Sequence, residues 1–299
     1  MTETTTTIGV VAHYNLLERL EPAGPGDLYR ARDTQHGRTV IVRLLPPRAA
    51  GESDPLLQQA VSLAGLSHPN AITLFGSGIH DDRIYLAFER ITGRSLRAEL
   101  GGRPMNARRA VELAIQIADA VAEAHALGFL HGGLSPEAIG ITAKGHAKIA
   151  TLQLGTTIGF EEPQAQGRLV DYRSPEEAAG AAGDERSDVY STGAVLYEML
   201  TARRPMPRGA SAPSAANATV PVTLDAVALR AIAPNPDRRF QAAAELASAL
   251  RAVLPGLELP DLAADVAAAD AGARSGQIAI LTLLVLAGLA GITWWVLHQ

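Results

Sequence analysis

The chain contains very few of the residues needed for lysine or cysteine chemistry. Among its 299 residues there is no cysteine, which excludes thiolate catalysis, disulfide bonds and Cys-ligated metal sites. Lys144 and Lys148 are the only lysines, so nearly all positive charge comes from arginine. The net charge of −5 provides no bulk attraction to nucleic acid. Any lysine-dependent reaction would therefore have to use one of two side chains.

The elements that would position reactive side chains change type along the chain. Residues 8–92 are rich in predicted strands, including a β-branched run at 40–42 and the segment 83–88, with one helix predicted over 56–66. From about residue 105, apolar residues recur at helical spacing, and this predicts helices near 110–121, 188–200, 224–232 and 240–253. With 47% hydrophobic residues, both parts can bury a core. We therefore expect an α+β fold in which a small β-rich lobe precedes a larger helical lobe, with a cleft between them.

Several short motifs in these elements share the order and spacing of one known family. They read YNLLERL at 14–20, LYRARD at 28–33, HPN at 68–70, FLH at 129–131, SPE at 174–176, RSDVYS at 186–191 and NPDRRF at 235–240. Together they resemble the bacterial Ser/Thr protein kinase domain over residues 14–254. The resemblance implies a two-lobed protein kinase-like fold, with an N-lobe over 13–92 and a C-lobe over 93–254.

The positions that carry out phosphoryl transfer in this family hold other residues here. Catalysis in the family needs a lysine paired with a glutamate, a base aspartate, and an Asp and an Asn that bind magnesium. The corresponding residues are Arg43 for the lysine, Gln59 for its glutamate partner, Gly133 for the base, Ser135 for the catalytic-loop lysine, Ala138 for the Asn and Thr151 for the metal-binding Asp. Without the original groups, the charge of the transition state loses its electrostatic support. The resemblance therefore implies a pseudokinase with no catalytic residue and no metal site, and we expect no enzyme activity.

The resemblance also implies a vestigial nucleotide pocket. Its residues would be Gly26, Leu28, Ile41, Arg43, Phe88 and Glu89. Only Gly26 remains of the glycine-rich lid, which reads EPAGPG at 21–26. Ile41 stands where the family has a small alanine above adenine, and Gly140 stands where it has a leucine below, so we hypothesise that Ile41 partly fills the adenine slot. No cofactor is expected, and ATP bound without a metal ion is the alternative.

Positions that hold the family's skeleton together are retained. They are His131, Leu152, Glu176, Asp188 and Arg239. The resemblance implies that Glu176 and Arg239 form an ion pair in the lower lobe and that Asp188 holds the backbone of the catalytic loop. It places His131 and Leu152 in a hydrophobic spine that crosses both lobes. A helix that serves kinases as a docking surface is replaced by a predicted flexible loop at 207–221.

The two ends of the chain differ from each other. Residues 1–12 are predicted to be a polar tail without the features of a signal peptide. Residues 255–277 read as an acidic, Ala-rich linker, and 278–297 contain no charged residue over a length that spans ~30 Å as a helix. We expect a transmembrane helix there, with the kinase-like domain on the cytoplasmic side of the cell membrane. Ala287 and Gly291 form a small-residue pair that would allow a homodimer.

These expectations combine into one interpretation with two alternatives. The sequence favours a single-pass, membrane-anchored pseudokinase that acts as a non-catalytic scaffold or allosteric regulator in signalling. Its partners would be proteins, such as an active kinase or envelope proteins, and not nucleic acid. The first alternative is a metal-independent nucleotide-binding sensor. The second is an atypical active Ser/Thr protein kinase that uses ATP.

Overall fold

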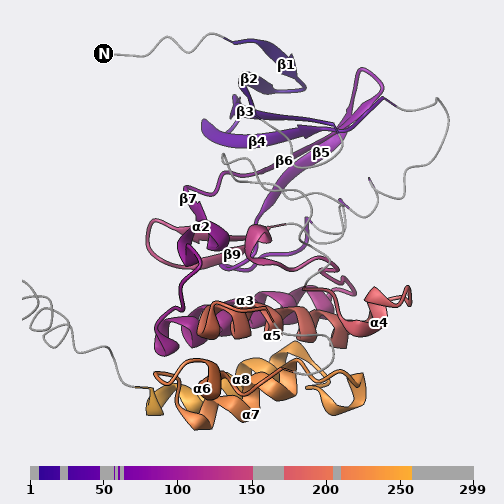
Figure 1. Cartoon of the computed structure of the whole chain (residues 1–299). Coiled ribbons are helices and arrows are strands. Elements are labelled where there is room, and N and C mark those ends of the chain that lie inside the picture. Colours follow the sequence, from indigo (N-terminus) through magenta and orange to yellow (C-terminus); the bar gives the residue numbers. More distant parts are fainter. Residues whose placement is uncertain are drawn as a thin grey trace, which may run out of the picture. The chain divides into compact units, whose positions relative to one another are not determined.

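An antiparallel sheet forms the N-terminal lobe (Figure 1). The computed structural model describes residues 7–20, 26–47, 57, 60, 64–150, 172–204 and 210–257, all within one unit that ends at Leu257. The strands of this sheet are β1 (Gly9–Val11), β2 (Tyr14–Leu20), β3 (Asp27–Asp33), β4 (Arg38–Leu44), β5 (Leu74–His80) and β6 (Arg83–Glu89). They lie in the order β1-β2-β3-β4-β6-β5.

The central strand β4 explains why the sheet has a core on both faces. Its residues from Val40 to Leu44 are all buried, as the β-branched run at 40–42 favours. Successive side chains of a strand point to opposite faces. Accordingly, Val40 and Val42 pack in one apolar cluster with Tyr14, while Ile41 packs in the main core of the molecule.

The sheet begins inside the segment that the sequence assigns to a polar tail. Strand β1 pairs with β2, and the Ile8 N–H donates to the carbonyl oxygen of Leu16 at 2.9 Å. Val11 is 2% exposed, so one apolar side chain of this short strand reaches the core of the lobe. Burial of Val11 and pairing with β2 therefore order residues 9–11, and the lobe starts before residue 13.

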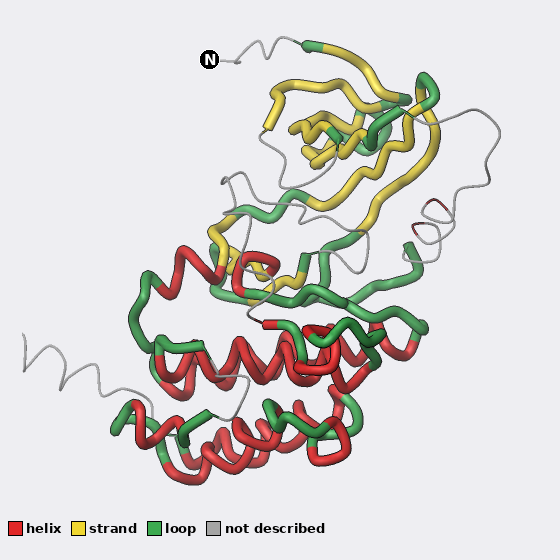
Figure 2. The backbone as a smooth tube through the Cα atoms, turned by 45° about the vertical axis from the view of Figure 1, so that its right-hand side comes forward, coloured by secondary structure: helices red, strands yellow, loops and turns green. Residues whose placement is uncertain are grey.

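Helices and a small sheet form the C-terminal lobe (Figure 2). The strands are β7 (Gly93–Ser95), β8 (Ile139–Thr142) and β9 (Ala147–Ile149), in the order β7-β8-β9. The helices are α2 (Leu96–Leu100), α3 (Ala107–Ala126), α4 (Pro175–Ala178), α5 (Glu185–Thr201), α6 (Pro213–Ala216), α7 (Val222–Ala231) and α8 (Ala243–Val253). Short 3-10 helices are η1 (Pro136–Ala138), η3 (Pro236–Arg238) and η4 (Leu254–Gly256).

Helix α5 is the centre of this lobe. Its residues from Ser187 to Thr201 are buried, and it packs against α3, α7 and α8. Gly193 allows the contact with α7, because a Cβ there would lie 2.6 Å from the Cβ of Ala231. Helix α3 buries one continuous stripe that includes Ala110, Ile117 and Val121, as its helical spacing predicts.

The predicted order of a β-rich lobe before a helical lobe is confirmed. In the segment 56–66, Leu57 and Ala60 are helical, and 56, 58–59 and 61–63 lie outside the described residues. The predicted flexible loop at 207–221 is wrong for Pro213–Ala216, which form the helical turn α6. Pro213 pre-sets the helical backbone, and the side chain and N–H of Ser214 donate to the carboxylate of Asp225.

The predicted membrane anchor falls outside what the structure describes. Residues 258–299, which include the expected helix at 278–297 and most of the linker, lie outside the described residues. Among the helices of the described part, none has the length and apolar character needed to span a membrane.

Candidate active site

One buried carboxylate holds the backbone of the loop that contains His131 and Gly132. Asp188, in the first turn of α5, is 2% exposed. Its Oδ2 accepts the N–H of His131 at 2.7 Å, and its Oδ1 accepts the N–H of Gly132 at 2.9 Å. His125, from the last turn of α3, places Nε2 2.8 Å from Oδ2 of Asp188. The loop that the resemblance assigns to catalysis is therefore fixed to both α3 and α5.

The side chains of this loop differ in burial. His131 is 3% exposed, and burial lowers the pKa of its imidazole. Ser135 is fully buried, and Ala138 is 3% exposed within η1. Gly133 faces open space, because a Cβ added there would meet no atom within 4 Å. The loop thus has a rigid frame with room for a side chain at position 133.

An ion pair between a fully buried arginine and a partly exposed glutamate lies in the same lobe. Arg239 Nη1 and Nη2 donate to Glu176 Oε1 and Oε2 at 2.7 and 2.8 Å, and the Arg239 side chain is 0% exposed. Its Nε donates to the carbonyl oxygen of Ala233, and its guanidinium carbon lies 4.9 Å from the ring centre of Tyr190. Burial alone would raise the pKa of Glu176, but the hydrogen bonds from Arg239 and other donors outweigh it and lower the pKa to about 2. The pair joins the segment after residue 171 to the segment before α8.

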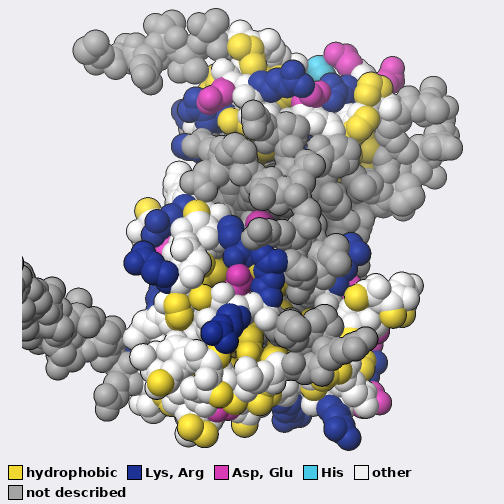
Figure 3. Space-filling view, viewed as in Figure 1, with side chains coloured by type: hydrophobic (Ala, Val, Ile, Leu, Met, Phe, Trp, Pro, Cys, Tyr) yellow, Lys and Arg dark blue, Asp and Glu magenta, His cyan; other side chains and the backbone are white. Residues whose placement is uncertain are grey.

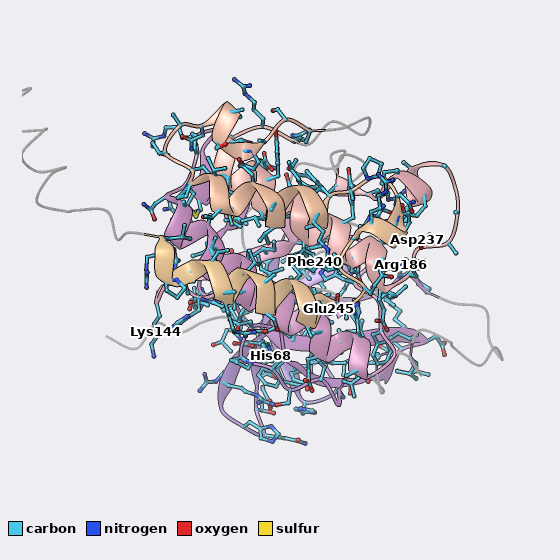
Figure 4. The ribbon with its side chains drawn as sticks, turned by 90° about the horizontal axis from the view of Figure 1, so that it is seen from below. His68, Lys144, Arg186, Asp237, Phe240 and Glu245 are labelled. Atoms are coloured by element: carbon cyan, nitrogen blue, oxygen red, sulfur yellow. The ribbon has the colours of Figure 1, made fainter. Side chains whose placement is uncertain are left out.

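Arg186 extends this junction at the surface. Its carbonyl oxygen accepts a hydrogen bond from Arg239 at 3.0 Å. Its Nη1 donates to Asp237 Oδ1 at 2.8 Å, and Figure 4 shows the two residues side by side. Its Nη2 donates to Asp184 Oδ2 at 2.7 Å. The first turn of α5 is thereby linked to η3.

Arg97 of α2 joins η1, α5 and the segment at Tyr172 near the loop. Its Nε donates to Glu137 Oε1 of η1 at 2.7 Å, and its Nη1 donates to Glu198 Oε1 of α5 at 2.7 Å. Its Nη2 also donates to the hydroxyl oxygen of Tyr172, which in turn donates to Glu198. Burial alone would lower the pKa of Arg97, but the bonds to the two glutamates outweigh it and raise the pKa. Burial, followed by the bond to Glu198, raises the pKa of Tyr172.

Sequence reasoning missed Arg97 and Glu198 as members of the site. They are far apart in the chain and in no motif that the resemblance used to assign chemistry, so their spacing carried no signal. Glu137 was visible because it lies in the loop, but its partner was not. Only the fold, which packs α2 against η1 and brings Arg97 within reach of Glu198 of α5, places the three side chains together.

The residues expected to line a nucleotide pocket lie just before and on β3, on β4 and at the end of β6. Leu28 is the register partner of Arg43, and Ile41 is the register partner of Phe88. Ile41 and Arg43 are 0% exposed, and Leu28 and Phe88 are 2% exposed. Burial lowers the pKa of Arg43 to about 10, so the guanidinium remains charged at neutral pH.

Gly26 has a structural reason to be glycine. Its φ is +90°, and a Cβ there would lie 2.1 Å from the carbonyl oxygen of Leu44. A larger residue would push β3 away from β4 at their paired ends. Retention of Gly26 therefore does not require a phosphate nearby.

Glu89, the last residue of β6, is tied to the C-terminal lobe. Lys148 of β9 donates from Nζ to Glu89 Oε2 at 2.8 Å and to the carbonyl oxygen of Ala71 at 3.2 Å. The Lys148 side chain is 15% exposed. One of the two lysines of the chain therefore links both lobes at the expected pocket, a role that the sequence did not predict.

Three of the predicted positions lie outside the described residues: Gln59, Thr151 and Leu152. The described residues contain no group of three or more His, Asp or Glu side chains placed to hold a metal ion.

Comparison with known proteins identifies the family. Residues 17–255 match the model of the protein kinase domain. The probable serine/threonine-protein kinase SCO3848 of Streptomyces coelicolor is 32% identical over 289 residues, which cover 87% of this chain and 42% of that protein. The serine/threonine-protein kinase PknB of Mycobacterium tuberculosis is 31% identical over 261 residues, covering 78% of this chain and 41% of that protein. The chain thus spans about two fifths of the length of these relatives.

A solved structure shares the fold. The kinase domain of Mycobacterium tuberculosis PknI matches with a TM-score of 0.64 and 22% identity, over 82% of this chain and 97% of that one. The sequence-based expectation that the chain is not an enzyme is wrong on these findings, because the relatives are named as kinases and the family match points to a kinase enzyme. The expected two-lobed kinase fold is confirmed. The chain belongs to the protein kinase domain family, and its relatives are bacterial serine/threonine-protein kinases.

Proposed function

We propose that the chain is an atypical serine/threonine-protein kinase that transfers a phosphoryl group from ATP to a hydroxyl of a protein. The observation that carries this proposal is the frame of the catalytic loop, in which Asp188 accepts the N–H groups of His131 and Gly132. Phosphoryl transfer depends mainly on positioning and electrostatic stabilisation, with little covalent chemistry for the protein to perform. A loop held in place therefore supports transfer even where reactive side chains have changed.

The residues present predict a slow reaction. A positioned general base contributes typically 10²–10⁴-fold to a rate, and position 133 holds a glycine. Glu137 does not replace the base, because its Oε1 accepts from Arg97 and its side chain is 11% exposed. The rate of phosphoryl transfer should therefore be at least about 100-fold lower than in family members that carry the base aspartate.

The same residues do not fit a magnesium ion as the family binds it. Ala138 offers no ligand atom, and no suitable group of acidic and histidine side chains exists in the described ranges. We propose that the nucleotide binds without a metal ion, and we assign no step to one. The charged Arg43 supports this proposal because it stands on β4 where the resemblance places the phosphate-binding lysine.

The setting of the reaction follows from the sequence. We propose that residues 278–297 anchor the protein in the cell membrane with the kinase domain in the cytoplasm. Acceptors would then be proteins at the same surface, such as another kinase or an envelope protein, since confinement raises effective concentration.

The test is phosphotransfer by the full chain in detergent micelles, with γ-labelled ATP and casein as a general acceptor. The decisive variant is Gly133→Asp, because the loop has room for the side chain and Gly133 has no positive φ. Gly256→Asp is the matched control, since its added Cβ also meets nothing within 4 Å and it lies at the end of the lobe. We expect slow transfer by the unmodified chain and at least about ten-fold faster transfer by Gly133→Asp.

Three outcomes test the two parts of the proposal, the kinase activity and the binding of nucleotide without a metal ion. Absence of transfer by both the unmodified chain and Gly133→Asp would refute the kinase activity. A rise in melting temperature with ATP in EDTA would support metal-free binding, because a ligand of the folded state raises its stability. A rise that needs magnesium would refute it.

A further inference from the structure

We infer that a pocket in the C-terminal lobe binds a phosphate monoester carried on a side chain of another protein. The pocket, called here the β8 pocket, has a volume of about 440 Å³ and is lined by β7, α2, α3, β8 and the turn that joins β8 to β9. All of its lining residues belong to the described part of the chain, and none belongs to the catalytic loop. The inference therefore goes beyond the proposed function and does not depend on it.

Two glycines shape the pocket. A Cβ at Gly93 of β7 would lie 1.9 Å from the carbonyl oxygen of Ile141, so only glycine lets β7 approach β8 this closely. Gly145, in the turn after β8, has a φ of +81°, and a Cβ there would lie 3.0 Å from Nη2 of Arg109. That Nη2 donates to the carbonyl oxygen of Gly145. The glycine thus lets the half-buried side chain of Arg109 reach the turn and form one wall of the pocket.

Arg109 brings a positive charge that no described carboxylate neutralises. Its partner, the carbonyl group of Gly145, is uncharged, and Arg109 forms no ion pair within the residues that the structure describes. The single acid that lines the pocket is Glu99, whose Oε2 accepts both Nε and Nη2 of Arg94 at 2.5 Å. Glu112, one turn further along α3, accepts from another arginine at 3.1 Å. The lining residues therefore carry two guanidinium groups against one carboxylate, which is already bound.

The sequence around the lining residues adds positive and not negative charge. Apart from Glu99 itself, no acidic residue is adjacent in the chain to any of them. Lys144, which lies in the turn and is labelled in Figure 4, is exposed and forms no ion pair in the described ranges. Figure 3 shows Lys and Arg side chains gathered at the level of α2. An anion therefore meets attraction at this pocket.

The pocket offers hydrogen-bond donors from its side chains. The backbone N–H groups of Ala143 and Gly145 are taken, because they donate to other backbone carbonyl oxygens at 3.2 and 2.8 Å. Thr142 Oγ1 accepts the N–H of His146 at 3.1 Å, so its hydroxyl hydrogen remains able to donate. The bond to Gly145 uses only part of the N–H groups of the Arg109 guanidinium. A ligand in the pocket thus meets donors that are waiting for acceptor oxygens.

A phosphate monoester matches these donors better than a carboxylate does. It carries a charge of about −1.5 to −2 at neutral pH and has three strong acceptor oxygens. A carboxylate carries one negative charge and has two oxygens, and Glu99 already supplies one such group to Arg94. Guanidinium and phosphate groups form paired, charge-assisted hydrogen bonds. The donor set therefore indicates a phosphate group.

The shape of the pocket indicates that this phosphate is carried on a protein side chain. The rim is open, because Ala143 is exposed and the side chain of Arg94 is 57% exposed. Sites for small molecules usually enclose their ligand with apolar and aromatic side chains. No aromatic residue is among those that line this pocket, and Ile141 is the only large apolar one. An open, polar pocket of this kind suits a phosphorylated side chain that remains attached to its protein.

The first experiment measures binding of phosphopeptides without nucleotide. The full chain in detergent micelles is titrated against three fluorescent peptides that differ at one residue, which is phosphoserine, glutamate or serine, and anisotropy is recorded. We expect the phosphoserine peptide to bind at least about ten-fold more tightly than the other two. Equal binding of the phosphoserine peptide and either of the others would overturn the inference. Competition by inorganic phosphate at the same affinity would also overturn it, because the ligand would then be the free ion.

Single substitutions locate the binding surface. Arg109→Gln should weaken binding of the phosphoserine peptide by about ten-fold or more, because it removes the charge that faces no described carboxylate. Arg238→Gln is the matched control, since Arg238 is exposed on η3 and does not line the pocket. Unchanged affinity in Arg109→Gln, or an equal loss in the control, would overturn the inference. Circular dichroism checks the fold, and if Arg109→Gln does not fold, the variant Arg94→Gln at an exposed side chain decides with the same expected loss.

The acidic residues of the chain itself give a further test. Glu258 and Asp261 follow the last described residue, Leu257, whose carbonyl oxygen accepts Nη1 of Arg108 at 3.1 Å. The double variant Glu258→Gln with Asp261→Asn should bind the phosphoserine peptide as the unmodified chain does. A gain in affinity of about ten-fold or more would overturn the inference, since the ligand of the pocket would then be part of the chain itself. The proposed function fails separately: absence of phosphotransfer refutes the kinase activity alone, whereas absence of a preference for phosphoserine refutes only this inference.

Discussion

Replacing Glu176 by glutamine should cost the protein about 3 kcal/mol of unfolding free energy. The pKa of Glu176 is about 2, against an ordinary value of 4.5. Each pKa unit corresponds to about 1.4 kcal/mol of preference for the charged form. The difference between the two pKa values therefore corresponds to about 3 kcal/mol of unfolding free energy. Burial independently supports a large effect, because the variant leaves the 0% exposed guanidinium of Arg239 without its carboxylate. Breaking a buried pair from one side typically costs about 3–5 kcal/mol.

The pH dependence of stability tests the same pair with a defined sign. Because the folded-state pKa lies below the unfolded-state value, the stabilisation is complete above about pH 4.5 and is lost as pH falls towards 2. Glu176→Gln should lack this part of the acid-side loss. Glu123→Gln is the matched control, since Glu123 is an exposed glutamate on α3.

Urea unfolding followed by circular dichroism measures both effects on the full chain in detergent. A loss below about 1 kcal/mol at neutral pH, with an unchanged profile between pH 4.5 and 2, would refute the argument. Such a result would mean that water stabilises the ionised carboxylate of Glu176 as much as Arg239 does. An equal loss in Glu123→Gln would instead show a general effect of net charge.

Three further changes test other parts of the frame. Asp188→Asn should lower the melting temperature by several degrees in calorimetry, since an amide cannot accept every hydrogen bond that the carboxylate accepts from the loop; no change would refute the loop-frame argument. Asp33 is fully buried, and hydrogen bonds from His36 and Arg38 outweigh its burial and lower its pKa to about 2. Stability should therefore fall as pH drops from 3.8 towards 2, and Asp33→Asn should remove that dependence in urea titrations at several pH values. Gly193→Ala should lower the unfolding free energy by about 1–3 kcal/mol, which urea titration detects as a lower midpoint, because the added methyl group would overlap α7. An unchanged midpoint would show that the two helices can move apart at no cost.

Sequence patterns predicted the elements well where burial follows one period. The stripe of α3 and the β-branched run of β4 repeat at helical and strand spacing, and both elements formed where expected. The patterns did not predict β1, because a strand of three residues is too short for alternation to show. They also missed α6, whose turn depends on Pro213 and on the contact between Ser214 and Asp225.

The site was less predictable than the fold because its contacts join distant segments. Local motifs pointed to Glu176, Asp188 and Arg239, which the structure joins to partners in other elements. The contact of Lys148 with Glu89 could not be read from spacing, since it depends on where β9 lies relative to β6. The same limit applied to Arg97, whose partners come from η1, α5 and the segment at Tyr172.

The expectation that the chain is not an enzyme rested on the side chains missing from the catalytic loop. The same analysis expected Asp188 to hold the backbone of this loop, and the structure shows those hydrogen bonds, with position 133 open on one side. A missing base lowers the rate by a factor, whereas a displaced loop would remove the positioning on which phosphoryl transfer mostly depends. Gly133→Asp separates these two effects, because it restores the carboxylate without altering the frame.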